Sequence, residues 1–271
     1  MNDAIRVENL TKCYGDRTVL KGLSFRVAKG EIFALLGANG AGKTTALECI
    51  EGLRRYDSGH ISLNGKTGIQ MQAAALPAHI RPMEAMRLVA CANRTEIDAS
   101  LLSALGISEL ANRQYAALST GQQRRLHLAL ALVGQPDILF LDEPTAGLDL
   151  EGRQSLHAYI RGLREQGKTI VLASHDMAEV AALSDRIAIL RSGELVFSGT
   201  SAELSTQADG CYTVSIRTDR EERQLLSADI AGTLLTLLDG CRRRGETVLD
   251  LRVEHGTLEQ HVLDIMGGKD I

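Results

Sequence analysis

The sequence predicts an α/β fold built on a parallel β-sheet. Short, nearly all-apolar runs are typical of strands that are buried on both faces, as strands of parallel sheets are. Four such runs occur, at residues 31–36, 138–141, 169–173 and 186–190. Helical patterns separate them, at residues 42–53, 121–133, 151–166 and 177–183. Strands that alternate with helices favour a parallel sheet with helices packed against it.

Two other kinds of segment accompany this sheet in the first 204 residues. Ile5, Val7 and the run Leu23–Val27 predict antiparallel strands near the N-terminus. Residues 73–118 show no strong strand pattern and are rich in Ala and Leu. They predict a helical insertion between sheet elements, which together with the following helix gives a helical subdomain at about residues 73–133.

A change of pattern after residue 204 predicts a small second module. Residues 212–216 alternate as a strand does, residues 230–238 follow a helical period, and residues 249–253 alternate again. Thr257–Gln260 fits a capping box that opens a final helix. We therefore expect one domain at residues 1–204 and a small α/β accessory module, in βαβα order, at residues 205–271.

Composition and charge argue against several classes of function. The 271 residues include 30 basic and 34 acidic side chains, a formal net charge of −4, and only 3% aromatics. Proteins that bind nucleic acid are usually basic or have stacking aromatics, so we expect no nucleic-acid partner. We find no apolar run near the roughly 18 residues of a membrane span and no signal-peptide pattern. The five scattered cysteines indicate reduced thiols and a cytoplasmic chain.

A phosphate-binding loop follows the first buried run. The string from Gly37 to Thr44 matches G-x-x-x-x-G-K-[ST] in full, between a predicted strand and a predicted helix. Glycines let the backbone N–H groups of such a loop point at one phosphate, and the helix N-terminus adds a favourable dipole. Lys43 would reach the β- and γ-phosphates, and Thr44 would bind Mg²⁺. The expected nucleotide contacts are Gly37, Asn39, Gly40, Ala41, Gly42, Lys43, Thr44 and Thr45.

Two consecutive carboxylates follow the second buried run. Asp142 and Glu143 come at the carboxyl end of the strand, where ligands bind in open α/β sheets. Asp142 is expected to hold Mg²⁺, and Glu143 to polarise the attacking water. Because Pro144 follows them, the pair is also compatible with a simple turn.

The string Leu118–Gln122, Leu-Ser-Thr-Gly-Gln, resembles the Leu-Ser-Gly-Gly-Gln signature of the ATP-binding subunits of ABC (ATP-binding cassette) transporters. It ends 20 residues before Asp142, as in that family. The resemblance covers about residues 4–204 and implies a P-loop ATPase core. It implies that Ser119, Gly121 and Gln122 contact the γ-phosphate of an ATP held by the opposite subunit. Ser119 is also suited to cap the helix that follows.

The resemblance assigns roles to four further residues. Tyr14 is similar to the aromatic that stacks on adenine, and Gln72 to the glutamine that contacts Mg²⁺ and the attacking water. His175 resembles the switch histidine that orients the γ-phosphate, and Asp149 resembles the last residue of the D-loop. Each has a plainer alternative. Tyr14 and His175 could be structural, Asp149 could cap a helix, and the neighbouring Gln70 offers another register for Gln72.

Thr120 departs from the family pattern, which has Gly at this position. A branched Cβ restricts the backbone more than Gly does, although the Thr120 N–H is still present. We therefore expect a somewhat weaker phosphate contact, with an effect on the rate of hydrolysis.

The resemblance also implies partners and a mechanism. Each ATP, with Mg²⁺, is expected between Lys43 of one chain and Ser119 of another, in a homodimer or heterodimer whose closure drives a separate polytopic permease. The chain would then lie on the cytoplasmic face of the membrane. The strings Ile69–Gln72 and Thr257–Glu259 resemble subunits of exporters. The alternatives are an ATPase that drives a membrane complex without transport, and a soluble ABC ATPase that acts on ribosomes or DNA.

Overall fold

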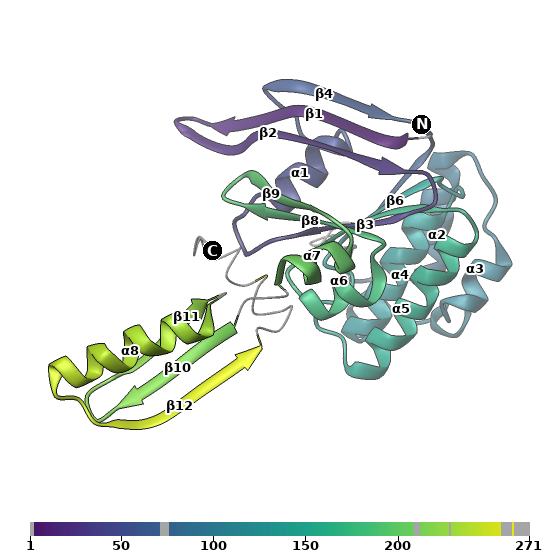
Figure 1. Cartoon of the computed structure of the whole chain (residues 1–271). Coiled ribbons are helices and arrows are strands. Elements are labelled where there is room, and N and C mark those ends of the chain that lie inside the picture. The colour runs from purple at the N-terminus through teal and green to yellow at the C-terminus, as the bar shows by residue number, and fades with distance from the viewer. Residues whose placement is uncertain (1–2, 71–75, 209–211, 228, 256–261, 263–271) are drawn as a thin grey trace. The chain divides into compact units, whose positions relative to one another are not determined.

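The structure is a computed structural model of the whole chain, and it describes residues 3–70, 76–208, 212–227, 229–255 and 262 (Figure 1). The chain forms two compact units, residues 1–198 and residues 199–271. The helix α7, Ser201–Ala208, therefore belongs to the second unit, although the sequence pattern changes only after residue 204.

The first unit is organised around a six-stranded sheet in the order β5-β6-β7-β3-β8-β9. The strands are β3 (Ile32–Leu36), β5 (Thr67–Gln70), β6 (Ile138–Asp142), β7 (Thr169–Ser174), β8 (Arg186–Arg191) and β9 (Glu194–Gly199). The five strands from β5 to β8 in this order pair in parallel, and every residue of β3, β6 and β7 is buried. The predicted α/β class and its four buried strands are confirmed. The sequence did not predict β5 or β9.

Helices cover both faces of this sheet because successive residues of a strand point to opposite sides. They are α1 (Lys43–Ile50), α4 (Thr120–Leu132), α5 (Leu150–Glu165) and α6 (Met177–Leu183). Phe140 of β6 packs in one core with Leu47 of α1. The neighbouring Leu139 packs in a second core with Leu126 of α4 and Ile160 of α5.

An antiparallel sheet and a helical segment complete the first unit (Figure 1). The sheet has the order β2-β1-β4, with β1 at Asp3–Tyr14, β2 at Arg17–Ala28 and β4 at Ser58–Leu63. Alternate apolar residues of β1 and β2 pack in the same core as α1. The predicted helical insertion contains α2 (Pro82–Asn93), α3 (Ala99–Ala104) and the 3₁₀ turns Ser108–Leu110 and Tyr115–Ala117.

The second unit has a three-stranded antiparallel sheet with one helix on one face. Besides α7, its elements are β10 (Tyr212–Thr218), β11 (Glu222–Ser227), α8 (Ile230–Arg244) and β12 (Val248–His255), and the strand order is β11-β10-β12. Val214 and Ile216 of β10 pack against Leu237 and Cys241 of α8. The predicted βαβα order omitted β11, and the final helix predicted from Thr257 lies outside the described residues.

Candidate nucleotide-binding and hydrolysis site

The turn between β3 and α1 depends on glycine at defined positions. A Cβ at Gly37 would lie 2.6 Å from the carbonyl oxygen of Leu190 on β8. Gly42 has φ 108°, a left-handed conformation, directly before α1. Within the turn, the Ala41 N–H donates to the Ala38 carbonyl at 3.1 Å, while Asn39 and Gly40 are exposed. The backbone thus makes the tight strand-to-helix turn that the phosphate-binding motif requires.

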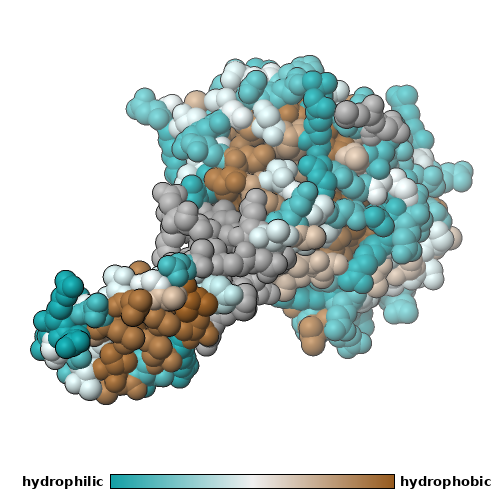
Figure 2. All heavy atoms as spheres, in the orientation of Figure 1, coloured by the Kyte–Doolittle hydropathy of each residue, from teal (hydrophilic) through white to brown (hydrophobic). Residues whose placement is uncertain are grey.

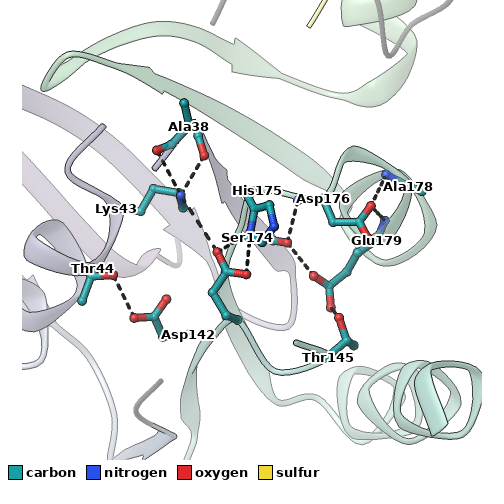
Figure 3. A network of polar contacts seen from close by, with 12 residues as sticks. Ala38, Lys43, Thr44, Asp142, Thr145, Ser174, His175, Asp176, Ala178 and Glu179 are labelled. Carbon is teal, nitrogen blue, oxygen red and sulfur yellow. Dashed lines mark hydrogen bonds and ion pairs between the residues drawn. The ribbon is translucent and has the colours of Figure 1, made fainter. Parts of the chain in front are cut away.

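Lys43 is buried beneath this loop (Figure 3). Its Nζ donates to the carbonyl oxygens of Gly37 at 2.7 Å and Ala38 at 3.3 Å, and lies 4.0 Å from Glu143 Oε1. Burial lowers the pKa of Lys43, and the negative charges of Glu143 and Asp142 oppose that change. The ammonium group is therefore held at the loop by carbonyls that an anionic ligand could replace.

Asp142, at the end of β6, has one satisfied and one unsatisfied oxygen. Thr44 Oγ1 donates to Asp142 Oδ2 at 3.0 Å, whereas Oδ1 is buried without a hydrogen-bond partner. Burial raises the pKa of this carboxyl group, and the Thr44 hydrogen bond lowers it. Thr44 follows Lys43 in the first turn of α1 and is exposed; Thr45 beside it is half-buried.

These oxygen donors fit a magnesium ion. Mg²⁺ is usually bound by one or two protein oxygens together with substrate phosphates and waters, not by a cage of side chains. The described residues contain no group of three or more His, Cys, Asp or Glu side chains that could hold a metal alone. Thr44 and Asp142 are therefore the described residues that would hold Mg²⁺ at this site.

Glu143 turns away from the line of β6 because its backbone has φ 51°, which is rare for a residue with a side chain. Its N–H donates to the Ala173 carbonyl at 2.9 Å, which fixes this turn to the neighbouring strand. Its carboxylate lies 2.7–2.8 Å from His175 Nδ1, just after the end of β7. A carboxylate can only accept, so Nδ1 carries the proton and the ring's Nε2 is left for another partner.

Glu179 connects the two loops that hold Glu143 and His175 (Figure 3). Its buried carboxylate accepts from Thr145 Oγ1 at 2.7 Å and from Ser174 Oγ at 2.6 Å. Ser174 Oγ in turn accepts from the Asp176 N–H at 3.0 Å. Sequence reasoning missed Glu179, although a carboxylate in the first turn of the helix after the Ser-His-Asp string was a usable signal.

The signature segment lies in a different part of the first unit. Ser119 is the N-cap of α4: its Oγ accepts from the Gln122 N–H at 3.3 Å, and its own N–H donates to Gln122 Oε1 at 3.0 Å. Ser119 and Thr120 are exposed, and Gly121 is half-buried. These residues line a cavity of about 770 Å³ together with Gly147, Leu148 and Asp149. Lys43, Asp142, Glu143 and His175 do not line it.

Asp149 makes the helix cap that was its plainer alternative. Its side chain accepts from the Gly152 N–H at 2.9 Å at the start of α5. The residue is exposed and lies in the same cavity as Ser119. Capping uses part of the carboxylate, so the geometry leaves Asp149 available for a contact with another chain as well.

Tyr14, the last residue of β1, is 43% exposed, and two cations lie near its ring. The Lys12 ammonium lies 5.2 Å and the Arg54 guanidinium 5.5 Å from the ring centroid, and Arg54 also donates to the Tyr14 hydroxyl. These contacts orient the ring at the surface of the antiparallel sheet.

The position of Gln72 lies outside the described residues. Gln70, the alternative register, is the last residue of β5 and is only 2% exposed. Neither polar atom of its side chain has a hydrogen-bond partner in the described structure. Gln70 therefore lies inside the protein and is not presented to a ligand at the surface.

Comparison with known proteins identifies the family. The family model described as ABC transporter matches residues 20–146. The linearmycin resistance ATP-binding protein LnrL of Bacillus subtilis is 35% identical in a 224-residue alignment that covers 76% of this chain and 72% of LnrL. The chain belongs to the ATP-binding subunits of ABC transporters. It is therefore an ATPase of the ATP-binding cassette type.

Other ABC proteins agree with this assignment. The daunorubicin resistance ATP-binding protein DrrA3 of Streptomyces coeruleorubidus is 33% identical, over 87% of this chain and 78% of that protein. The Nod factor export ATP-binding protein I of Rhizobium meliloti is 38% identical, over 79% and 69%. A solved ATP-binding subunit of an ABC transporter superposes with TM-score 0.68 at 26% identity, over 75% of this chain and 92% of that one. Among the described residues, no helix of this ABC subunit is long and apolar enough to cross a membrane.

Proposed function

We propose that this ABC ATPase works as a dimer in which each ATP is held between Lys43 of one chain and Ser119 of the other. The supporting observation is that the two half-sites are separate within one chain. The cavity that contains Ser119, Gly121 and Gln122 is lined by none of the charged residues around Lys43. A second chain supplies the missing half to each nucleotide.

Each residue around the phosphate-binding loop has its own proposed role in binding the nucleotide and Mg²⁺. Lys43 exchanges its loop carbonyls for the β- and γ-phosphate oxygens, and the loop from Gly37 to Thr45 surrounds them. Thr44 and Asp142, together with Gln72, hold Mg²⁺, which neutralises phosphate charge when bound. Tyr14 stacks on the adenine. Asp149 contacts the opposite chain at the same interface as Ser119.

Glu143 is the general base of the proposed reaction. A water oxygen attacks the γ-phosphorus, its proton passes to the Glu143 carboxylate, and the bond to the bridging oxygen of ADP breaks. His175 holds the carboxylate through Nδ1–H, and its other ring nitrogen faces the γ-phosphate. Glu179 keeps the two loops in register, so the base and the histidine stay together.

The dimer is proposed to drive export through a separate polytopic membrane subunit. The support comes from the relatives, which are named for Nod factor export and for resistance to linearmycin and daunorubicin. This ATPase would then lie at the cytoplasmic face of the membrane, attached through its partner.

Mixing two inactive variants tests the composite site. Lys43→Ala removes the phosphate half, and Gly121→Glu blocks the signature half, where a Cβ would be in ordinary contact, 3.5 Å from Leu148 Cδ2. Random pairing makes half of the dimers mixed, each with one intact site, so about a quarter of the parental ATPase activity should return. Activity that stays at the level of the single variants would show that both motifs act on one nucleotide in one chain.

A mild-detergent pull-down from native membranes tests the transport function. A co-purified membrane protein of about six predicted spans supports the exporter. Recovery with ribosomes or DNA would favour the soluble ABC ATPase instead. A partner with few spans and a large extracytoplasmic domain would favour an ATPase that drives a complex without transport.

A further inference from the structure

The second unit exposes a group of large apolar side chains that its own helix does not cover. Leu235 and Leu238 of α8 are 67% and 42% exposed. On β12, Leu249 is 61% exposed, and Leu251 and Val253 are each 39% exposed. Figure 2 shows apolar residues gathered on this unit. Contiguous exposed apolar surface of this kind marks an interaction site more often than scattered single residues do. We call these five residues the α8–β12 surface.

The surface is continuous because the apolar flank of α8 faces β12. Thr233 Oγ1 donates to Ser227 Oγ of β11 at 2.6 Å. The flank of α8 that carries Thr233 therefore points toward β11. At 100° per residue, Leu238 and Leu235 fall on the opposite flank. The sheet order β11-β10-β12 places β12 on that side.

Of the two edge strands in the described sheet, β12 is the more exposed to pairing. Among the described side chains, β11 exposes one large apolar residue, Leu225, whereas β12 exposes three. On β12, exposed Leu251 and Val253 alternate with Asp250 and Arg252. An exposed apolar edge strand is a template for pairing with another chain.

The charges of β12 specify which chain fits it. We propose that β12 pairs antiparallel with β12 of a second copy, about a two-fold axis at Leu251. That register sets each Asp250 opposite the other chain's Arg252, and each Leu251 opposite its own copy. Shifting the axis by one residue would oppose Asp250 to Asp250 or Arg252 to Arg252, which is unfavourable. The strand is thus self-complementary in one register, as a two-fold interface requires.

This contact needs no nucleotide, which separates it from the proposed ATP-dependent closure. A second interface on the same chain raises the effective concentration for the first when both can be engaged at once. A weak contact at β12 would then be enough to keep two ATPase chains together between cycles of hydrolysis.

Charge reversal in the full-length chain tests the register. Without nucleotide, sedimentation should show a reversible dimer, and Asp250→Arg or Arg252→Asp alone should weaken it about tenfold, because like charges then meet twice. An equimolar mixture of these two variants should recover the affinity, because every reversed residue meets its opposite. A mixture no stronger than the single variants would overturn the proposal.

A matched pair of apolar variants tests the surface itself. Leu251→Lys sets two like charges at the axis and should abolish the nucleotide-free dimer. Leu225→Lys, on the β11 edge at a similar 41% exposure and on the same face of the sheet, should not. Equal effects of the two variants, or a parent chain that stays monomeric without nucleotide at every concentration, would refute the β12 pairing. The ATPase mixing experiment is unaffected by either result, so failure of one proposal is distinguishable from failure of the other.

Discussion

The phosphate half-site and the signature half-site of this ATPase are built in opposite ways. Lys43, Asp142 and Glu143 are ionisable side chains that are each 5–6% exposed, with Lys43 at the start of α1 and the two carboxylic acids at the end of β6. Ser119 and Thr120 are exposed and uncharged, and a reciprocal cap at the start of one helix holds them. Burying the ionisable groups of the phosphate half-site costs folding free energy, and the surrounding strands and helix fix their positions. The residues of the signature half-site are uncharged and exposed, so they carry no such cost.

The difference between the two half-sites suits them to different tasks in nucleotide binding. Buried charges without full partners destabilise the protein that contains them, and a ligand of opposite charge relieves that cost. In the proposed function, the phosphate half would therefore select the nucleotide. In the proposed dimer, the signature half would add hydrogen-bond donors at a helix N-terminus, where they act only when another chain's phosphate approaches. Four changes would test this contrast.

The largest expected effect is in the phosphate half. Glu143→Gln keeps the shape of the side chain but cannot accept the proton of the attacking water. ATP hydrolysis should fall about a thousandfold, a typical loss for a general base. Binding of a fluorescent ATP analogue should be unchanged, which controls for folding. A variant that retains a tenth or more of the activity would mean that another group takes the proton.

Asp142→Asn should separate stability from activity. Because burial raises the pKa of Asp142, its ionised form is disfavoured in the folded chain. The amide oxygen still accepts from Thr44, so the nucleotide-free chain should melt a few °C higher. Hydrolysis should fall about a hundredfold or more as the magnesium ligand is lost. A melting temperature below that of the parent chain would contradict the conclusion that the buried Asp142 carboxylate destabilises the fold.

Glu51, just after α1, gives the phosphate half a pH dependence. Burial, together with the charges of Asp142 and Glu48, raises the pKa of Glu51 from 4.5 to about 7. Between these values the folded chain binds one proton more than the unfolded chain, so stability falls as the pH rises. The slope is up to about 1.4 kcal/mol per pH unit. Urea titrations at three pH values should show that Glu51→Gln flattens this slope. If the stability of the parent chain does not change between pH 4.5 and about 7, this pH dependence is disproved.

The smallest effect is expected in the signature half. A Cβ placed on Gly147 would lie only 3.2 Å from Thr120 Cγ2, so the Thr120 methyl group lies against the D-loop. Thr120→Gly should cost about 1 kcal/mol of unfolding free energy through the lost methyl and the freer backbone. Hydrolysis should rise, by less than about fivefold, as the signature approaches phosphate more closely.

Thr120→Val keeps the methyl group and is the matched control for that change. It should leave both the unfolding free energy and the hydrolysis rate near those of the parent chain. If Thr120→Val changes both as much as Thr120→Gly does, the hydroxyl and not the methyl is responsible.

The sequence predicted the parts of this molecule that local physics determines. The short apolar run at 138–141 predicted a strand buried on both faces, which the structure confirms, and the Gly-rich turn located Lys43 and Thr44. The sequence could not show that Glu143 adopts a left-handed backbone, or that Glu179 joins its loop to that of His175, because both depend on which strands are neighbours. The short, half-exposed β11 was missed because it lacks a clear alternation.

The contacts that His175 and Lys43 make with Glu143 would delay hydrolysis until the substrate is bound. Without a nucleotide, the Glu143 carboxylate accepts from His175 Nδ1–H and lies 4.0 Å from the Lys43 ammonium group. In the proposed reaction, an arriving γ-phosphate attracts the Lys43 ammonium group, while His175 stays on the carboxylate. The substrate itself would therefore release Glu143 from Lys43, whereas in a chain without ATP the Glu143 carboxylate would keep both neighbours.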